Sequence, residues 1–228
     1  MCGRFTLFAD PADLQELFNL SAPPPADVAS LVAPRYNIAP TQPVAVIANG
    51  ETRVLELFKW GLIPSWAKDP KIGNRMINAR AETLAEKPSF RTALKKRRCL
   101  ILANGFYEWK REGKSKTPMY IQMKDGRPFA FAGLWEAWKS PDDREAWIKS
   151  CTIITTEPND LMSMIHDRMP VILHPRDYAK WLDSTPQTPD QLKLLIKPFP
   201  ADEMDAYPVS TLVNKPQNDL PELVVPAK

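Results

Sequence analysis

The sequence predicts an α+β fold, a single domain with a largely antiparallel, barrel-like β core flanked by short helices. Strand-like apolar segments follow one another through the middle of the chain, whereas helical spacings occur near its ends. Proline makes up 24 of 228 residues, twice the usual share of about 5%, which favours short elements over long helices. With 44% hydrophobic residues, residues 1–228 are expected to form one domain, allowing for a loose tail at the C-terminal end.

The first predicted element is a helix that begins after Asp10. Asp10 followed by Pro11 is a favourable N-cap and first-turn pair, and Leu14 and Leu17 share one helical face. The prolines at 23–25 end this segment. Further short helices are expected at 89–94, leading into the basic run 95–98, and around 159–165, 175–182 and 189–196.

Strands dominate the middle of the chain. They are predicted at 44–48, 54–60, 99–103, 106–110, 119–123, 129–135 and around 147–155. Asn49-Gly50 separates the first two strands and is a strong hairpin signal. Asn104-Gly105 and Asp125-Gly126 are predicted to form turns between later strands. The pattern shows neither an internal repeat nor a low-complexity tract.

Composition excludes several classes of protein. A net charge of +3 is too small to indicate a nucleic-acid binder by itself. The sequence contains neither a targeting segment nor an apolar run of the ~18 residues that a membrane span needs, so a cytoplasmic protein is expected. Three cysteines argue against a disulfide framework, and Cys99 and Cys151 are expected to be small buried strand residues. Two histidines without metal-ligand spacing argue against a metal site.

Cys2 is the most informative residue for chemistry, because it directly follows the initiator Met1. Cells normally trim Met1 before a small residue, which would leave Cys2 with a free α-amine beside its thiol. These groups titrate at about 7.7–8 and 8.5, so both are reactive near neutral pH. Such an aminothiol can attack an amide carbonyl as an N-terminal nucleophile, or it can condense with an aldehyde to a thiazolidine.

Two titratable residues could support such chemistry. His166 lies in a polar cluster between apolar segments, where it could transfer protons or merely bond locally. His174 precedes Pro175 at a helix start, and a structural role is expected for it. Glu108 lies on a predicted strand among aromatic residues, where desolvation could make it a general acid, although an exposed strand glutamate is the alternative.

Other segments offer contacts for a polar ligand. Asn78 and Arg80, separated by one residue, provide an amide and a guanidinium for a sugar and a phosphate. Trp66, Met76 and Pro40 are apolar residues in polar loops, which suit stacking on bases but could equally belong to the core.

Six motifs occur together in one order along the chain. They are Cys2-Gly3-Arg4-Phe5, Arg35-Tyr36-Asn37-Ile38-Ala39-Pro40-Thr41, Trp60-Gly61-Leu62-Ile63-Pro64-Ser65-Trp66, Ile77-Asn78-Ala79-Arg80-Ala81-Glu82-Thr83, Gly105-Phe106-Tyr107-Glu108-Trp109-Lys110 and Ile165-His166-Asp167-Arg168-Met169-Pro170. Over nearly its whole length the chain resembles the SOS-response-associated peptidase (SRAP) family. It departs from the family pattern at residues 102–105 and at Pro158, which affects the expected backbone shape beside Glu108 and Thr155.

The resemblance implies a sensor of abasic sites in single-stranded DNA that forms a covalent thiazolidine crosslink through Cys2 after Met1 is removed. By the same match Cys2 is the nucleophile and Asn78 positions its amine. Glu108 is the general acid/base, and His166 shuttles protons during ring closure and reversal. The implied DNA contacts are Arg4, Arg80 and Arg168 to phosphates, with Asn37, Pro40, Trp66 and Thr155 along the channel.

The resemblance also implies autoproteolytic removal of Met1 by Cys2 and Glu108. The expected partner is single-stranded DNA with abasic sites, with single-strand/double-strand junctions as a further candidate. We expect a monomer that needs neither a cofactor nor a membrane, and that is associated with the nucleoid when bound to DNA.

Two other functions remain open on the sequence. One is an N-terminal-nucleophile glutamine amidotransferase, although its glycine-rich loops are not apparent in a chain with 8 glycines. The other is a noncovalent single-strand-binding module without chemistry. An adduct with abasic DNA would distinguish the crosslinking protein from both.

Overall fold

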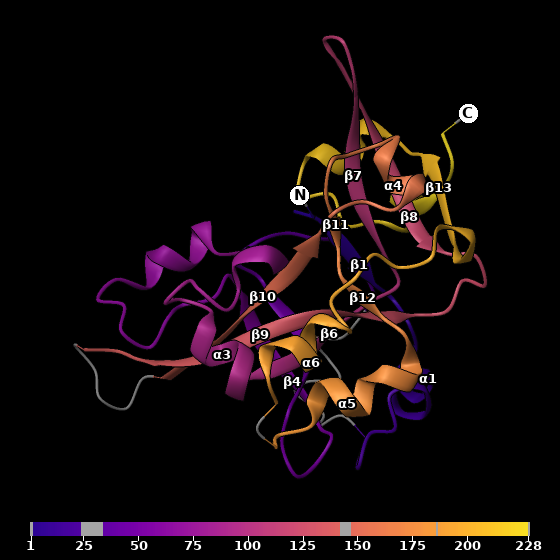
Figure 1. Cartoon of the computed structure of the whole chain (residues 1–228). Helices are drawn as coiled ribbons and strands as arrows, with labels where there is room; N and C mark the ends of the chain where they lie inside the picture. Colours follow the sequence, from indigo (N-terminus) through magenta and orange to yellow (C-terminus); the bar gives the residue numbers. More distant parts are fainter. Residues whose placement is uncertain (1, 24–33, 142–146, 186, 228) are drawn as a thin grey trace.

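The structure is a computed structural model that describes residues 2–23, 34–141, 147–185 and 187–227 (Figure 1). Its centre is a closed barrel, whose strands follow one another around it as β3 (Pro43–Ala48), β4 (Leu55–Trp60), β10 (Trp147–Thr156), β9 (Phe129–Lys139) and β6 (Arg98–Ala103). Neighbouring strands are antiparallel except β10 and β4, which run parallel. The predicted barrel-like, largely antiparallel core is therefore confirmed.

Aromatic and β-branched side chains fill the barrel. Phe5 contacts the rings of Trp60 and Phe131 edge-on, at centroid distances of 5.0 and 5.7 Å. Cys99 and Cys151 are fully buried in β6 and β10, which confirms their prediction as small core residues. Because such packing tolerates little change in volume, the barrel is a rigid base for the polar groups at its rim.

Short strands extend the barrel at the rim. They are β5 (Asn78–Arg80) and β11 (Met169–Pro170), which pair with β10, and β12 (Ile172–Leu173), which pairs with β9. Through this pairing Arg80 and Pro170 both lie opposite Thr155 of β10. Two segments far apart in the sequence therefore meet at one end of β10.

A second sheet, entirely antiparallel, lies beside the barrel. Its order is β13 (Met204–Pro208), β8 (Ser115–Met123), β7 (Gly105–Glu112), β1 (Phe5–Leu7) and β2 (Arg35–Ile38). The β7–β8 hairpin extends well beyond the rest of this sheet (Figure 1). The N-terminal strand β1 pairs on both sides, and Cys2, shortly before it, lies in the interior.

Helices are short, as the proline content predicts. They are α1 (Pro11–Leu17), α3 (Arg91–Lys96), α4 (Asp160–Ser163), α5 (Tyr178–Leu182) and α6 (Pro189–Lys193), with 3₁₀ turns at Pro70–Arg75, Ala81–Thr83, Pro175–Asp177, Ala201–Glu203, Thr211–Asn214 and Pro221–Val224. The predicted Asp10 cap is confirmed, because its carboxylate accepts a hydrogen bond from the Ala12 amide at 2.8 Å. Among the described residues, none of the helices has the length and apolarity that crossing a bilayer requires.

Two predicted turns differ from the structure. β3 and β4 pair as expected, but Ile47 lies opposite Leu55, so the connection is longer than Asn49-Gly50. The Asn49 side chain instead accepts from the Arg98 amide at 3.0 Å. The predicted turn at residues 104–105 is also wrong, because the chain there passes from the barrel directly into β7 of the second sheet.

Gly105 has a steric role at this passage. A Cβ atom on it would lie 2.3 Å from the Tyr120 ring on the neighbouring strand β8. By contrast, Gly126 has φ +72° in the predicted turn after β8, which is thereby confirmed.

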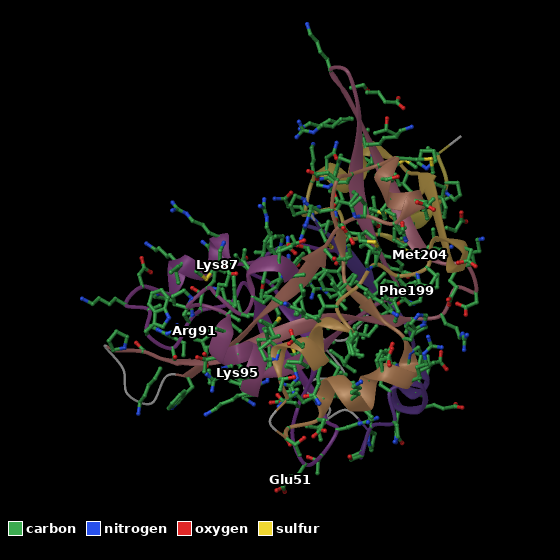
Figure 2. The ribbon with its side chains drawn as sticks, in the orientation of Figure 1. Glu51, Lys87, Arg91, Lys95, Phe199 and Met204 are labelled. Carbon is green, nitrogen blue, oxygen red and sulfur yellow. The ribbon has the colours of Figure 1, made fainter. Side chains whose placement is uncertain are left out.

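The basic run at residues 95–98 is only partly a solvated helix end. Arg91 and Lys95 project outward from α3 and Lys87 from the segment before it, as Figure 2 shows, and all three are exposed. Arg98 is instead fully buried, and its guanidinium donates to backbone carbonyls, including that of Trp181 at 2.8 Å. These acceptors compensate for the buried charge.

The described residues near the C-terminal end pack against the second sheet. Leu223 is fully buried beside Tyr107 and Tyr120. Val209 and Pro226 form a β-bridge, which holds the last described residues in place.

Candidate active site

Cys2 lies at the start of the segment that enters β1 and is fully buried. The Asn78 side-chain amide donates a hydrogen bond to the Cys2 carbonyl at 2.8 Å. Burial raises the pKa of the Cys2 thiol well above its ordinary value, and the negative charge of Glu108 raises it further. The resting thiol is therefore protonated at neutral pH.

Glu108 is brought to Cys2 by strand pairing. β7 lies next to β1, with Phe106 opposite Phe5, and the Tyr107 amide donates to the Arg4 carbonyl at 2.9 Å. Side chains alternate at the start of this strand, where Phe106 joins the main core and Tyr107 a separate cluster. Glu108 is buried, which contradicts the alternative of an exposed strand glutamate.

His166 follows α4 and is held by local hydrogen bonds. The Asn159 side chain caps α4 by accepting from the Met162 amide at 2.8 Å, and the His166 amide donates to the Met162 carbonyl at 2.8 Å. The ring Nδ1 accepts from the Arg168 amide at 3.0 Å and lies 2.8 Å from the Asp167 carboxylate. Nδ1 of His166 thus lies between a backbone N–H donor and a carboxylate that can only accept a hydrogen bond.

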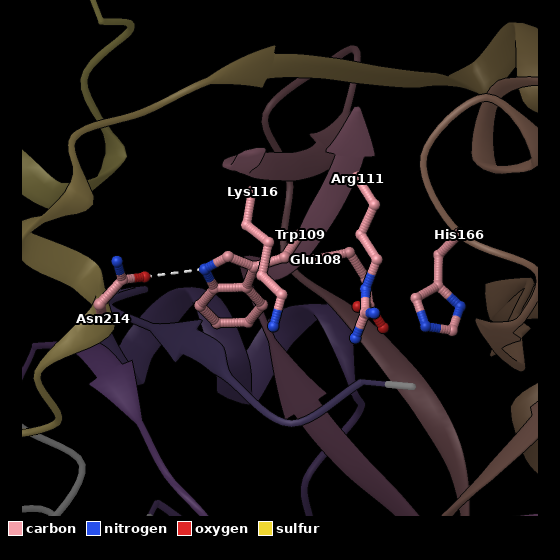
Figure 3. Close-up of a pocket in the computed structure, with 6 residues that line it drawn as sticks. All are labelled: Glu108, Trp109, Arg111, Lys116, His166 and Asn214. Atoms are coloured by element: carbon pink, nitrogen blue, oxygen red, sulfur yellow. Dashed lines mark hydrogen bonds between the residues drawn. The ribbon is translucent and has the colours of Figure 1, made fainter. Parts of the chain in front are cut away.

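Glu108 and His166 share one hollow of about 460 Å³. Figure 3 shows their side chains pointing toward each other, with Arg111 close by. The residues that line it are Glu108, Trp109, Arg111, Lys116, His166 and Asn214. A buried carboxylate and an imidazole can transfer protons to and from a group that reacts with the neighbouring Cys2. No group of three potential metal-binding side chains occurs within the described ranges.

Arg4 is engaged within the protein. Its Nη1 donates to the Asn37 side-chain oxygen at 2.7 Å and to the Val213 carbonyl at 2.8 Å. The Asn37 amide donates in turn to the Lys215 carbonyl at 3.0 Å. Because Asn37 is buried, the structure does not support its predicted contact with DNA along the channel, and Asn37 positions Arg4 instead.

Arg168 and Thr155 show a similar arrangement. Arg168 donates to both carboxylate oxygens of Glu82, at 2.6 and 3.0 Å, and to the Thr155 carbonyl at 2.7 Å. Thr155 is fully buried, so its predicted place on the channel wall is also unsupported. A phosphate that binds Arg168 has to compete with Glu82.

Arg80, Trp66 and Pro40 are accessible, as their predicted roles require. Arg80 is exposed at the end of β5, and the Trp66 side chain is 58% exposed in the loop after β4. Pro40 is half-buried after β2. An exposed indole offers a face on which a base can stack. The structure thus leaves these three residues available for DNA.

Sequence reasoning missed Arg111, Lys116 and Asn214, which line the same hollow as Glu108. The hairpin at Gly113 is the feature that could have indicated Arg111 and Lys116. Gly113, with φ +60°, turns the chain so that Lys116 lies opposite Arg111. Asn214 accepts a hydrogen bond from Trp109 Nε1 at 2.7 Å, and no local pattern predicts a contact between residues so distant in sequence.

Known proteins resemble the chain along its whole length. The family model for SOS response associated peptidase (SRAP) matches residues 1–216. Abasic site processing protein YoqW of Bacillus subtilis is 52% identical over 98% of the chain and 99% of its own length. Abasic site processing protein HMCES of Xenopus tropicalis is 36% identical over 83% of the chain and 65% of its own length. A crystal structure of a Bacteroides thetaiotaomicron protein superposes with a TM-score of 0.90 at 30% identity, covering both chains completely.

Proposed function

The chain belongs to the SOS response associated peptidase family, and from this premise we propose that it processes abasic sites in single-stranded DNA by covalent capture. Relatives that share about half of its residues are named abasic site processing proteins, which supports the substrate. The observation that carries the chemistry is the convergence of the half-buried Asn78 with the buried Cys2 and Glu108.

The protonated state of the Cys2 thiol sets the order of events. With Met1 removed, the α-amine attacks the aldehyde of the ring-opened sugar and releases water, which gives a Schiff base. The thiol then adds to the same carbon, its sulfur forming the new bond while its proton is transferred to the nitrogen. The product is a thiazolidine, and the tethered thiol reacts at high effective concentration.

Glu108 and His166 have separate tasks in this sequence. Glu108 accepts the thiol proton and returns it to the ring nitrogen, because its charge acts directly on Cys2. His166, across the hollow, shuttles protons during ring closure and crosslink reversal. Asn78 fixes the Cys2 carbonyl, so the α-amine keeps one orientation. The same Cys2 and Glu108 would carry the peptidase activity that releases Met1.

DNA is held by residues at the rim. Arg80 contacts a phosphate, Trp66 and Pro40 stack on bases, and Arg168 takes a phosphate in exchange for Glu82. Arg4 contributes to phosphate binding from its fixed position. We infer that the protein acts as a monomer in the cytoplasm, at the nucleoid when bound, on single strands and on single-strand/double-strand junctions.

Incubation with an abasic oligonucleotide, followed by a denaturing gel and intact mass measurement, tests the proposal. Wild type should give a heat-stable adduct whose mass is that of protein plus DNA less one water. Cys2→Ala should give none, and Cys2→Ser should give only a Schiff base that borohydride traps. Cys151→Ala is the matched control, because it removes an equally buried thiol that has no neighbouring α-amine, and it should leave the adduct intact.

An uncleavable N-terminal extension separates the aminothiol mechanism from its alternatives. A heat-stable adduct that still carries the extension would overturn the mechanism, because the α-amine would then be blocked. Binding to abasic DNA without an adduct would indicate a noncovalent module. Glutamine hydrolysis would indicate an amidotransferase.

A further inference from the structure

We propose that a groove between the β7–β8 hairpin and α4 holds the nucleotide next to the lesion, with Arg111 and Lys116 binding its phosphate. The inference rests on the proposed function and adds Arg111, Lys116 and Met164, which lie outside the six motifs.

The groove consists of two adjoining hollows. The first, of about 460 Å³, contains Glu108, and the second, of about 500 Å³, reaches residues 163–167, from the last residue of α4 onward. Trp109, Arg111 and His166 line both hollows. Sites for small molecules span about 300–1,000 Å³, so the groove accommodates a nucleotide. Because His166 belongs to both parts, the second hollow adjoins the one that contains Glu108.

The positive charges of the β7–β8 hairpin favour a phosphate in the groove. Arg111 and Lys116 are exposed and lie directly opposite each other in the β7–β8 register. Two like charges in such positions destabilise a hairpin unless an anion joins them. The neighbouring Lys110 has its own carboxylate, Glu112, at 2.7 Å, whereas neither Arg111 nor Lys116 forms an ion pair within the described parts of the chain. A phosphate between them would remove the repulsion.

Apolar surface suits the base of the same nucleotide. Met164 is 64% exposed on the second hollow, next to Trp109. The Trp109 indole is fixed by its hydrogen bond to Asn214 and by the Arg4 guanidinium 6.0 Å from its ring centroid. A fixed indole and a flexible thioether together offer a surface that any base can contact. The groove therefore binds without sequence preference.

Acidic groups limit where the phosphate can lie. Glu108 and the exposed Asp167 also face the groove. A phosphate is repelled by both, so it is expected at the hairpin wall, where Arg111 and Lys116 project. The sugar and base then extend toward Met164.

Fluorescence anisotropy of a labelled oligothymidylate, titrated at several salt concentrations, tests the phosphate contacts. Single strands release about 0.7 counterion per phosphate contact, so Arg111→Gln with Lys116→Gln should make the slope of log affinity against log salt shallower by about 1.4. Lys114→Gln removes a charge at the hairpin turn, outside both hollows, and should leave the slope unchanged. Arg111→Lys with Lys116→Arg should restore the wild-type slope. An unchanged slope in the double glutamine variant would overturn the proposal.

Oligonucleotides with a tetrahydrofuran abasic analogue at the 5′ or the 3′ end locate the contact. The analogue cannot form the crosslink, so affinity is read without the chemistry. The double glutamine variant should lose its defect on one of these two strands, the one that lacks the nucleotide in the groove. An equal defect on both would refute a site next to the lesion. Failure of wild type to give an adduct with true abasic DNA would refute the proposed function and leave these binding results standing.

Discussion

Replacing Glu82 by Gln should strengthen DNA binding, although it removes an ion pair from the protein. Glu82 holds the Arg168 guanidinium at 2.6 and 3.0 Å through both of its carboxylate oxygens. In the proposed complex a DNA phosphate binds the same face of Arg168, so the carboxylate would compete with it in the free protein. Glutamine keeps the shape of the side chain and removes the competing charge.

The size of the effect follows from the exposure of the pair. The Glu82 side chain is 53% exposed, and ion pairs of this kind contribute only about 0.2–1 kcal/mol. Removing the competitor should therefore raise the affinity for single-stranded DNA about 1.4–5-fold. Because Arg168 then neutralises a phosphate without opposition, the salt slope should steepen by about 0.7.

The increase in DNA affinity of Glu82→Gln over wild type should be constant above mildly acidic pH. The hydrogen bonds from Arg168 hold the pKa of Glu82 below its ordinary value. A carboxyl with a depressed pKa contributes stability that is present above its unfolded pKa and is lost as pH falls through the folded value. Between pH 5 and 8 Glu82 thus stays charged, and wild type and variant should differ by the same factor.

Anisotropy titrations at several salt concentrations measure both quantities, with Glu86→Gln as the matched control. Glu86 is exposed on the same segment, so its replacement removes the same charge without freeing an arginine. Weaker binding by Glu82→Gln, or a slope equal to that of Glu86→Gln, would show that Glu82 orients Arg168 instead of competing for it.

Other predictions concern the chemistry, the stacking and the arginines. Glu108→Gln and His166→Ala should slow adduct formation and release by up to about 10²–10⁴-fold, while affinity for an intact single strand, measured by anisotropy, stays nearly unchanged. Trp66→Ala should weaken that affinity by about 1–3 kcal/mol without altering the salt slope, and a changed slope would contradict stacking. Arg4→Ala should lower the free energy of unfolding in urea by about 1–3 kcal/mol, because two hydrogen bonds of a half-buried guanidinium are lost. Arg80→Ala should leave stability unchanged and make the salt slope shallower by about 0.7; lower stability with an unchanged slope would contradict a phosphate contact of Arg80.

The barrel and its strands could be predicted because their patterns are local. Alternation and β-branched runs mark the strands of the barrel, and Asp10 with Pro11 marks the first helix. The turns at Asn49 and Gly105 could not be predicted, because their backbones are set by distant partners: Arg98 for the first and Tyr120 for the second.

The candidate site shows the same division. The motifs point to Cys2 and Glu108, and strand pairing does bring these residues together. The sequence could not show that the side chains of Asn37 and Thr155 are buried. A polar residue in a motif can face solvent or bond to a buried carbonyl, and its sequence context does not distinguish the two. Arg111 and Lys116 could not be predicted as a pair, because they face each other only through the register of β7 and β8. The sequence of one strand does not determine that register.

The position of β1 has a mechanical consequence. A chain terminus usually frays, but Cys2 is followed by a strand that is bonded on both sides, to β2 and to β7. A force applied to DNA linked at Cys2 would load β1 along its axis, where the hydrogen bonds to both neighbours resist together in shear. A motor that pulls on the damaged strand would have to rupture the sheet before it could peel the end of the chain away.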